Sequence, residues 1–322
     1  MKVKNLAFLA TTLFFLSPHV YSQKNIDSLL LREKNRFEKT YPDAQKINGP
    51  ALTTVMQQIA REEGFADSSK KDIAAFYSLV CRFEDTLRYL GVKPGDYEHF
   101  FNEFNKIFHS DMKAEYEYHT GYLSEPLPGW RNRKHIGGSE GGDWYCITGT
   151  GALFMAVAEK MGFEVKYTIL ANHLMAWVGN RKSGMYCDLV FGKKYSGKNA
   201  VEAEWGRIED EFPPSNTLKV QSIYDQVMAL ESWKKGDIAM EMGVILPALE
   251  LFDDTERLFK QAIEKNPKIS TYYRLLGEYY DYRGNPGAAI IFYKKAREIN
   301  PAQDVENALT KAESKLSKSK KP

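Results

Sequence analysis

Apolar residues recur at spacings of three and four through much of the first third of the chain. The stretches IDSLLLREKNRF, LTTVMQQIA and IAAFYSLVCRFEDTLRYLGV each show this pattern, which predicts amphipathic helices. Gly91 and Pro94 mark the end of the third stretch, and YEHFFNEFNKIFHSDM predicts a further helix. We therefore expect residues 23–120 to form a helical N-terminal region that packs on the core of the protein.

The pattern changes after a connection rich in Gly, Pro and Ser at residues 121–143. The next apolar positions share one helical face until Gly162, which is placed to end a helix. The segment EVKYTI then alternates polar and apolar residues, as a strand does, and HLMAWV and MYCDLVF flank the turn-rich GNRKSG, as in an antiparallel hairpin. The sequence thus predicts an α+β core over residues 121–215, with a helix packed on an antiparallel sheet.

A repeat with a period of 34 residues occupies the C-terminal part. AIEKNP begins at Ala262 and AREINP begins at Ala296, and this offset is the tetratricopeptide period. We expect a connecting segment at 216–235, two tetratricopeptide repeats at 236–303, and a capping helix with a basic tail at 304–322. The second repeat has residues of the expected size at Tyr273, Leu276, Gly277, Tyr280, Gly284, Ala289, Tyr293, Ala296 and Pro301. The first repeat matches less fully, at Gly243, Leu246, Phe259, Ala262 and Pro267.

Residues 1–22 have the composition of a secretory signal peptide. Lys2 and Lys4 precede an apolar run from Leu6 to Leu16, which is too short to span a membrane, and small residues suited to cleavage follow. We expect an exported protein, periplasmic or secreted, with no stable membrane anchor. Removal of the two lysines turns 44 basic and 42 acidic residues into 42 of each, and this balance argues against a nucleic-acid partner.

The three cysteines of an exported chain leave at least one unpaired. Cys81 and Cys187 lie in apolar surroundings, where a disulfide or two buried thiols would both be ordinary. Cys146 precedes the helical run GALFMAVAEKMGF, and a helix N-terminus lowers the pKa of a thiol. The amide of Cys146 could also donate to an oxyanion. Taken alone, a small buried cysteine at the start of a helix explains the same residue.

Two further residues make the chemical interpretation more specific. His173 begins the first strand of the predicted hairpin, and Asp188 lies on its return strand, either opposite His173 or one step away on the same face. A thiol nucleophile, a base and a carboxylate that orients the base form a catalytic triad.

The stretch from Asp143 to Phe191 resembles the core of the transglutaminase-like superfamily, which shares the papain-type fold. The similarity rests on CITGTGALFMAVAEKMGFEVKYTIL, NHLMAWV and YCDLV, and covers about fifty residues. It implies Cys146 as nucleophile, His173 as general base and Asp188 as the residue that orients the base. Ile147 departs from the aromatic residue that often follows the nucleophile in this family. An upstream Trp or Gln often completes the oxyanion hole of the family, so the resemblance makes Trp144, Asn172 and Trp130 the candidates for oxyanion or substrate binding.

These observations predict an exported cysteine hydrolase or acyltransferase that acts on amide bonds of a protein or peptide through a thioester. The alternative is a catalytically inactive transglutaminase-like protein that serves, with its repeats, as a peptide- or protein-binding scaffold. The repeats are a further place for a protein partner. No zinc signature, phosphate-binding loop or dinucleotide motif occurs in the sequence, so we expect no metal and no cofactor.

Overall fold

A computed structural model of the chain describes residue 39 and residues 67–107, 142–171, 173–189 and 192–319. The side chains of residues 67–76, 79 and 142–150 are outside this description. The helices and strands described below all belong to one compact unit, Ile47–Pro322. The predicted signal peptide, Trp130 and Asn172 lie outside the described residues.

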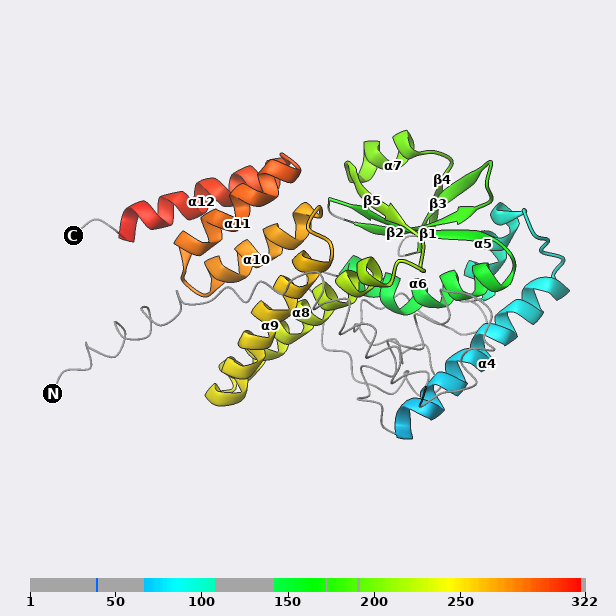
Figure 1. Ribbon diagram of the computed structural model, residues 1–322, viewed down its shortest axis with the longest axis horizontal. Coiled ribbons are helices and arrows are strands. Elements are labelled where there is room, and N and C mark those ends of the chain that lie inside the picture. The colour runs from blue at the N-terminus through cyan, green and yellow to red at the C-terminus, as the bar shows by residue number, and fades with distance from the viewer. Residues whose placement is uncertain (1–38, 40–66, 108–141, 172, 190–191, 320–322) are drawn as a thin grey trace. The chain divides into compact units, whose positions relative to one another are not determined.

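The described part contains both helices and strands, which confirms the α+β class (Figure 1). The helices are α4 (Asp67–Tyr89), α5 (Tyr97–Lys106), α6 (Gly142–Lys160), α7 (Lys198–Trp205), α8 (Thr217–Glu241), α9 (Ile245–Lys265), α10 (Ser270–Tyr282), α11 (Pro286–Ile299) and α12 (Gln303–Ser319). The strands are β1 (Glu164–Leu170), β2 (Leu174–Gly179), β3 (Gly184–Asp188), β4 (Lys193–Tyr195) and β5 (Ile208–Phe212). Among these helices, none is both long and apolar enough to span a membrane.

The strands form one antiparallel sheet in the order β4-β3-β2-β1-β5. The hairpin predicted from HLMAWV and MYCDLVF is confirmed as β2 and β3, with Ala176 opposite Cys187. Its turn is closed by the Asn180 N–H, which donates to the Ser183 carbonyl at 2.8 Å. The predicted strand after Gly162 is confirmed as β1, and Gly162 itself has a φ of 88°, as a residue that ends a helix often does.

The two faces of the sheet have different coverings. Helix α6 packs on β1 and β2, and α7 lies on the opposite side of the sheet (Figure 1). Side chains of Leu170, Met175 and Tyr186 form a cluster with Val201 and the partly buried Trp205 of α7. Residues 152–158 of α6 are all buried, as expected of a helix that is apolar on every side.

The N-terminal helices attach to α6 through aromatic side chains. The rings of Phe100 and Phe104 in α5 lie 5.1 Å and 5.0 Å from that of Phe154 in α6, and Phe100 also lies 4.9 Å from Phe163. Helix α4 contacts both α5 and α6. The expected packing of helical segments on the core therefore holds for α4 and α5.

The C-terminal helices form two helical hairpins and a final helix, α12, in the place expected for the cap. The α8/α9 hairpin turns at Gly243 and the α10/α11 hairpin at Gly284, both with positive φ. The hydrogen bonds of the two turns match as well. The N–H of Val244 donates to the Ala239 carbonyl, and the N–H of Asn285 donates to the Tyr280 carbonyl. Gly243 is thus the counterpart of Gly284, which lies 41 residues later rather than 34.

This alignment corrects the predicted position of the first repeat. Gly236, rather than Gly243, is the counterpart of Gly277, because each lies against an aromatic ring sixteen residues later, Phe252 and Tyr293. Helix α9 is seven residues longer than α11. Seven residues make about two helical turns, so the extra length of α9 keeps its apolar residues on the same face of the helix. The spacing of apolar residues in the sequence therefore shows no break at the extra turns. The segment 216–235, expected to be a connection, lies almost entirely within α8.

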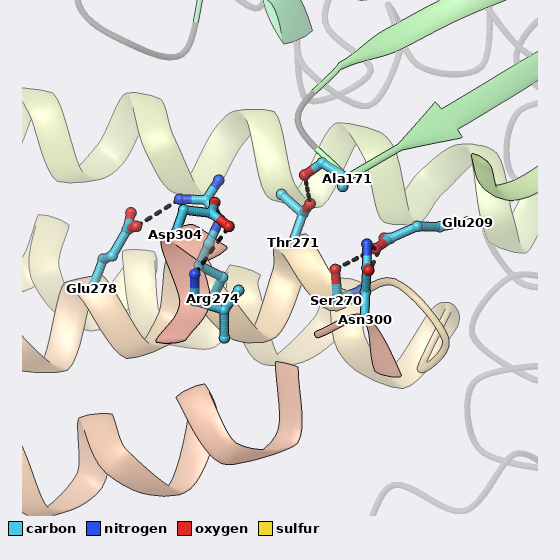
Figure 2. A network of polar contacts seen from close by, with 9 residues as sticks. Ala171, Glu209, Ser270, Thr271, Arg274, Glu278, Asn300 and Asp304 are labelled. Atoms are coloured by element: carbon cyan, nitrogen blue, oxygen red, sulfur yellow. Dashed lines mark hydrogen bonds and ion pairs between the residues drawn. The ribbon is translucent and has the colours of Figure 1, made fainter. Parts of the chain in front are cut away.

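Two adjacent carboxylates of β5 bind the asparagines of both repeated NP motifs. Asn266 donates to Asp210 at 2.9 Å, and Asn300 donates to Glu209 at 3.0 Å. Glu209 also accepts from the backbone N–H of Ser270, at 3.0 Å, and from its hydroxyl, and so caps the first turn of α10 (Figure 2). These bonds attach the helical hairpins to the edge of the sheet.

A further bond joins α10 to the turn between β1 and β2. The hydroxyl of Thr271, fully buried within α10, donates to the carbonyl of Ala171 (Figure 2). The N–H of Ala171 donates to the carbonyl of Arg207 at 3.3 Å. Both polar groups of this turn residue are therefore bonded to other parts of the chain.

The glycine contacts predict a difference between two Gly-to-Ala substitutions. At Gly277 an added methyl would lie 2.7 Å from the Tyr293 ring, so Gly277→Ala should lower the free energy of unfolding by about 1–3 kcal/mol, the usual cost of overpacking. At Gly287 the nearest atom would be 3.7 Å away, so Gly287→Ala should be neutral or slightly stabilising. Urea denaturation of both variants measures the difference. Equal midpoints would contradict the close approach of α10 and α11.

Candidate active site

His173 occupies the residue directly before β2, at the end of the β1/β2 hairpin. The Leu170 N–H donates to the His173 carbonyl at 2.8 Å and closes the turn. Asp188 is the last residue of β3, and the register of β2 with β3 puts it opposite Met175. His173 lies two residues before Met175 and therefore on the same face, one step from Asp188. This is the second of the two arrangements expected from the sequence.

The side chains of His173 and Asp188 meet in the interior. The Nε2 atom of His173 lies 3.2 Å from Oδ2 of Asp188, and both side chains are 0% exposed. A buried carboxylate needs a partner that can share its charge, and an imidazole supplies one. Because Nε2 faces the carboxylate, a proton exchanged between the imidazole and a third group would pass through Nδ1.

The imidazole is covered by Trp205, the last residue of α7. The two rings are stacked with centroids 4.1 Å apart and planes 20° apart. The Trp205 indole N–H donates to the Tyr195 hydroxyl at 3.0 Å, and that hydroxyl donates to Glu204 at 2.9 Å. Lys193 pairs with the other oxygen of Glu204 at 2.7 Å, and this pairing lowers the pKa of the Glu204 carboxyl. A chain of polar contacts therefore fixes the indole that covers His173.

Trp205, Tyr195 and Glu204 were not among the sequence-predicted site residues. They come from β4 and α7, which span three and eight residues and are too short for a periodic pattern. The only available signal was the aromatic and acidic composition of YSGKNAVEAEW.

Cys146 lies within α6, but not at its first residue. The helix begins at Gly142, so Cys146 is in the second turn, where regular geometry directs its N–H to the Gly142 carbonyl. The expectation that Cys146 begins the helix is therefore wrong by one turn, and its amide is used within the helix instead of being open to an oxyanion. The field of a helix terminus falls off within the first turn, so a thiolate at Cys146 depends mainly on a neighbouring cation.

Helix α6, which carries Cys146, packs on the face of the sheet opposite the one to which His173 and Asp188 point, so Cys146 would approach His173 around the end of the sheet. The tight turn at Gly162 reverses the chain between α6 and β1, which pack together. From Lys160 back to Cys146 the helix rises about 21 Å. From Glu164 to Leu170 the strand advances about 20 Å. His173 directly precedes β2 and β1 ends at Leu170, so His173 lies at the end of these two strands, where the two faces of the sheet meet.

Trp144 lies in the first turn of α6, and its side chain is outside the described residues, as is that of Cys146. In the described part of the chain, no group of three or more His, Cys, Asp or Glu residues is arranged to hold a metal ion. Cys81 and Cys187 are free thiols, half-buried and buried respectively, so the alternative of two thiols holds for them. Comparison of the chain with protein-family models, with curated proteins and with solved structures finds no match.

Cys187 should be unreactive in the folded protein. Burial, and then the charge of Asp188, raise the pKa of the Cys187 thiol well above its ordinary value of 9.0. The thiolate population of Cys187 is therefore small at neutral and mildly alkaline pH. We expect little alkylation of Cys187 by iodoacetamide at about pH 8 and full alkylation after unfolding in urea, as measured by mass spectrometry. Rapid alkylation in the folded state would contradict its burial.

Proposed function

We propose that the protein is an exported cysteine hydrolase or acyltransferase of the transglutaminase-like type, acting on amide bonds of a protein or peptide. The observation that supports this proposal is the buried His173–Asp188 pair. A base with its orienting carboxylate is what a thiol nucleophile requires. No cofactor enters the proposed reaction.

In the proposed reaction the Cys146 thiolate attacks the amide carbonyl carbon and forms a tetrahedral intermediate. The C–N bond breaks as His173, protonated at Nδ1, gives its proton to the leaving amine, and a thioester remains. Water, or a second amine, then attacks the thioester while His173 takes a proton from it. The C–S bond breaks, and the carboxylic acid or new amide is released with the cysteine restored.

Asp188 acts in this scheme by orienting the imidazole and stabilising its cationic form. Trp205 limits rotation of the ring and excludes water from the face that it covers. The imidazolium is therefore the cation that favours the Cys146 thiolate.

The first test is alkylation of Cys146 as a function of pH, with His173→Ala as the comparison. An imidazolium–thiolate pair should make Cys146 react with iodoacetamide at about pH 6, at a rate that falls at least about tenfold in His173→Ala. Mass spectrometry separates the three cysteines, and Cys187 in the same sample is an internal control. Slow alkylation of Cys146 in both proteins would refute the proposed pair.

Asp188→Asn should reduce the alkylation rate of Cys146 without abolishing the reaction. The substitution keeps the volume of the buried side chain but removes the charge that holds the imidazole. We expect alkylation of Cys146 at about pH 6 to be slower than in the parent and the thermal midpoint to fall by a few degrees. Gly287→Ala is a control for the protein preparation. A rate equal to that of the parent, in a folded variant, would exclude a role for Asp188.

Binding of a peptide or protein as a scaffold is the second candidate function, because the helical hairpins contain a cavity of their own. A cavity of about 420 Å³ lies between α8, α10, α11 and α12, and its lining includes Trp233, Tyr282 and Lys311. A protein with an unreactive Cys146 and a peptide bound in this cavity would fit the scaffold and not the enzyme.

A further inference from the structure

A groove of about 770 Å³ lies on the face of the sheet opposite α6. It is bounded by the turn between β2 and β3, by β4 and by the segment that leads into α7. It shares the sheet face of the His173–Asp188 pair but does not include that pair among its lining residues. The groove is therefore a separate feature beside the candidate active site.

Four side chains of the groove stand in one row across four strands. Lys166 is opposite Trp177, Trp177 is opposite Tyr186, and Tyr186 is opposite Tyr195. Residues directly opposite one another in antiparallel strands point to the same face. The row spans three strand spacings, about 14 Å.

Trp177 is held flat on the sheet by two glycines. A methyl group added at Gly184 would lie 2.2 Å from the indole, and one added at Gly179 would lie 2.8 Å from it. The Lys166 ammonium lies 4.3 Å over the centre of the same ring. A preformed aromatic surface with a cation upon it is present before any ligand binds.

Basic side chains outnumber acidic ones in the groove. Its charged lining residues are Lys166, Arg181, Lys182, Lys194, Lys198, Glu98 and Glu164. Lys194 pairs with Glu98, Arg181 approaches Glu164 at 3.8 Å, and Lys198 approaches Glu202 at 3.6 Å. Within the residues that the structure describes, Lys166 and Lys182 have no carboxylate at ion-pair distance. This surplus favours an anionic ligand.

We propose that the groove binds an extended acidic peptide. An extended chain advances about 3.3 Å per residue, so about four residues span the row. Carboxylates about four residues apart would meet Lys166 or Lys182 at one end and Lys194 or Lys198 at the other. Apolar or aromatic side chains between them would lie on Trp177 and the neighbouring tyrosines.

Tyr195 connects this groove to the candidate active site. Its hydroxyl accepts from the Trp205 indole that stacks on His173, so the groove ends two contacts from the imidazole. The identification of the acidic peptide as a substrate rests on the proposed function. The binding itself does not, because none of the groove residues takes part in the proposed reaction.

Binding is tested by fluorescence anisotropy with the full chain carrying Cys146→Ala, so that no turnover occurs. The probe is a fluorescein-labelled peptide with glutamate at every fourth position and alanine or tyrosine between, and the matched probe has glutamine in place of glutamate. We expect the acidic peptide to bind at least about tenfold more tightly, and Lys166→Glu with Lys182→Glu to remove that preference. Lys294→Glu with Lys295→Glu, on the exposed face of α11, should change the affinity less than about twofold.

A charge-reversed probe guards against a folding artefact. The double variant at Lys166 and Lys182 should gain affinity for the same peptide with lysine in place of glutamate, which a misfolded protein would not do. Equal binding of the acidic and amide peptides, or full binding of the acidic peptide by the double variant, would overturn the proposal. If the acidic peptide does not bind but Cys146 is alkylated rapidly, the proposed peptide site is refuted and the proposed reaction is not. If the peptide binds but Cys146 is alkylated slowly, the proposed reaction is refuted and the peptide site is not.

Discussion

The arrangement of the described structure depends on two adjacent carboxylates, Glu209 and Asp210, at the edge of the sheet. Each accepts a hydrogen bond from the asparagine of one repeat, and Glu209 also caps the first turn of α10. An orphan helix N–H, the buried amide of Asn266 and the half-buried amide of Asn300 are thereby satisfied by a strand that has no apolar pattern. The NP motif that revealed the repeat is therefore also the part of each repeat that recognises the sheet.

The sequence predicted those elements whose burial leaves a local pattern. Helices α4, α5 and α9 to α12 have an apolar side set by packing, and this side appears as a regular spacing. Helix α6 and strands β1 to β3 are buried along most of their length, and they appear as apolar segments bounded by turn residues. Strands β4 and β5 carry the residues KKY and IEDEF, whose polar side chains are fixed by individual ion pairs and hydrogen bonds. Such pairs depend on where two distant segments meet, and no local pattern encodes that.

The features of the candidate site also differ in whether a local sequence pattern could predict them. The separation of His173 from Asp188 could be predicted because a hairpin fixes which residues share a face. The stacking of Trp205 on His173 could not, since it depends on the angle at which a short helix returns to the sheet. The start of α6 was misjudged by one turn because Gly142 and Asp143 are as compatible with a loop as with a first helical turn, where an acidic residue is favourable.

The bond from Thr271 to Ala171 gives the helical hairpins a mechanical relation to the imidazole. Ala171 is two residues before His173, and its carbonyl is held by α10 while its N–H is held by Arg207. Helix α8 also runs without interruption from the edge of the sheet into the first hairpin. A force on the hairpins, or an exchange of one hairpin for another, would therefore act on the backbone beside His173.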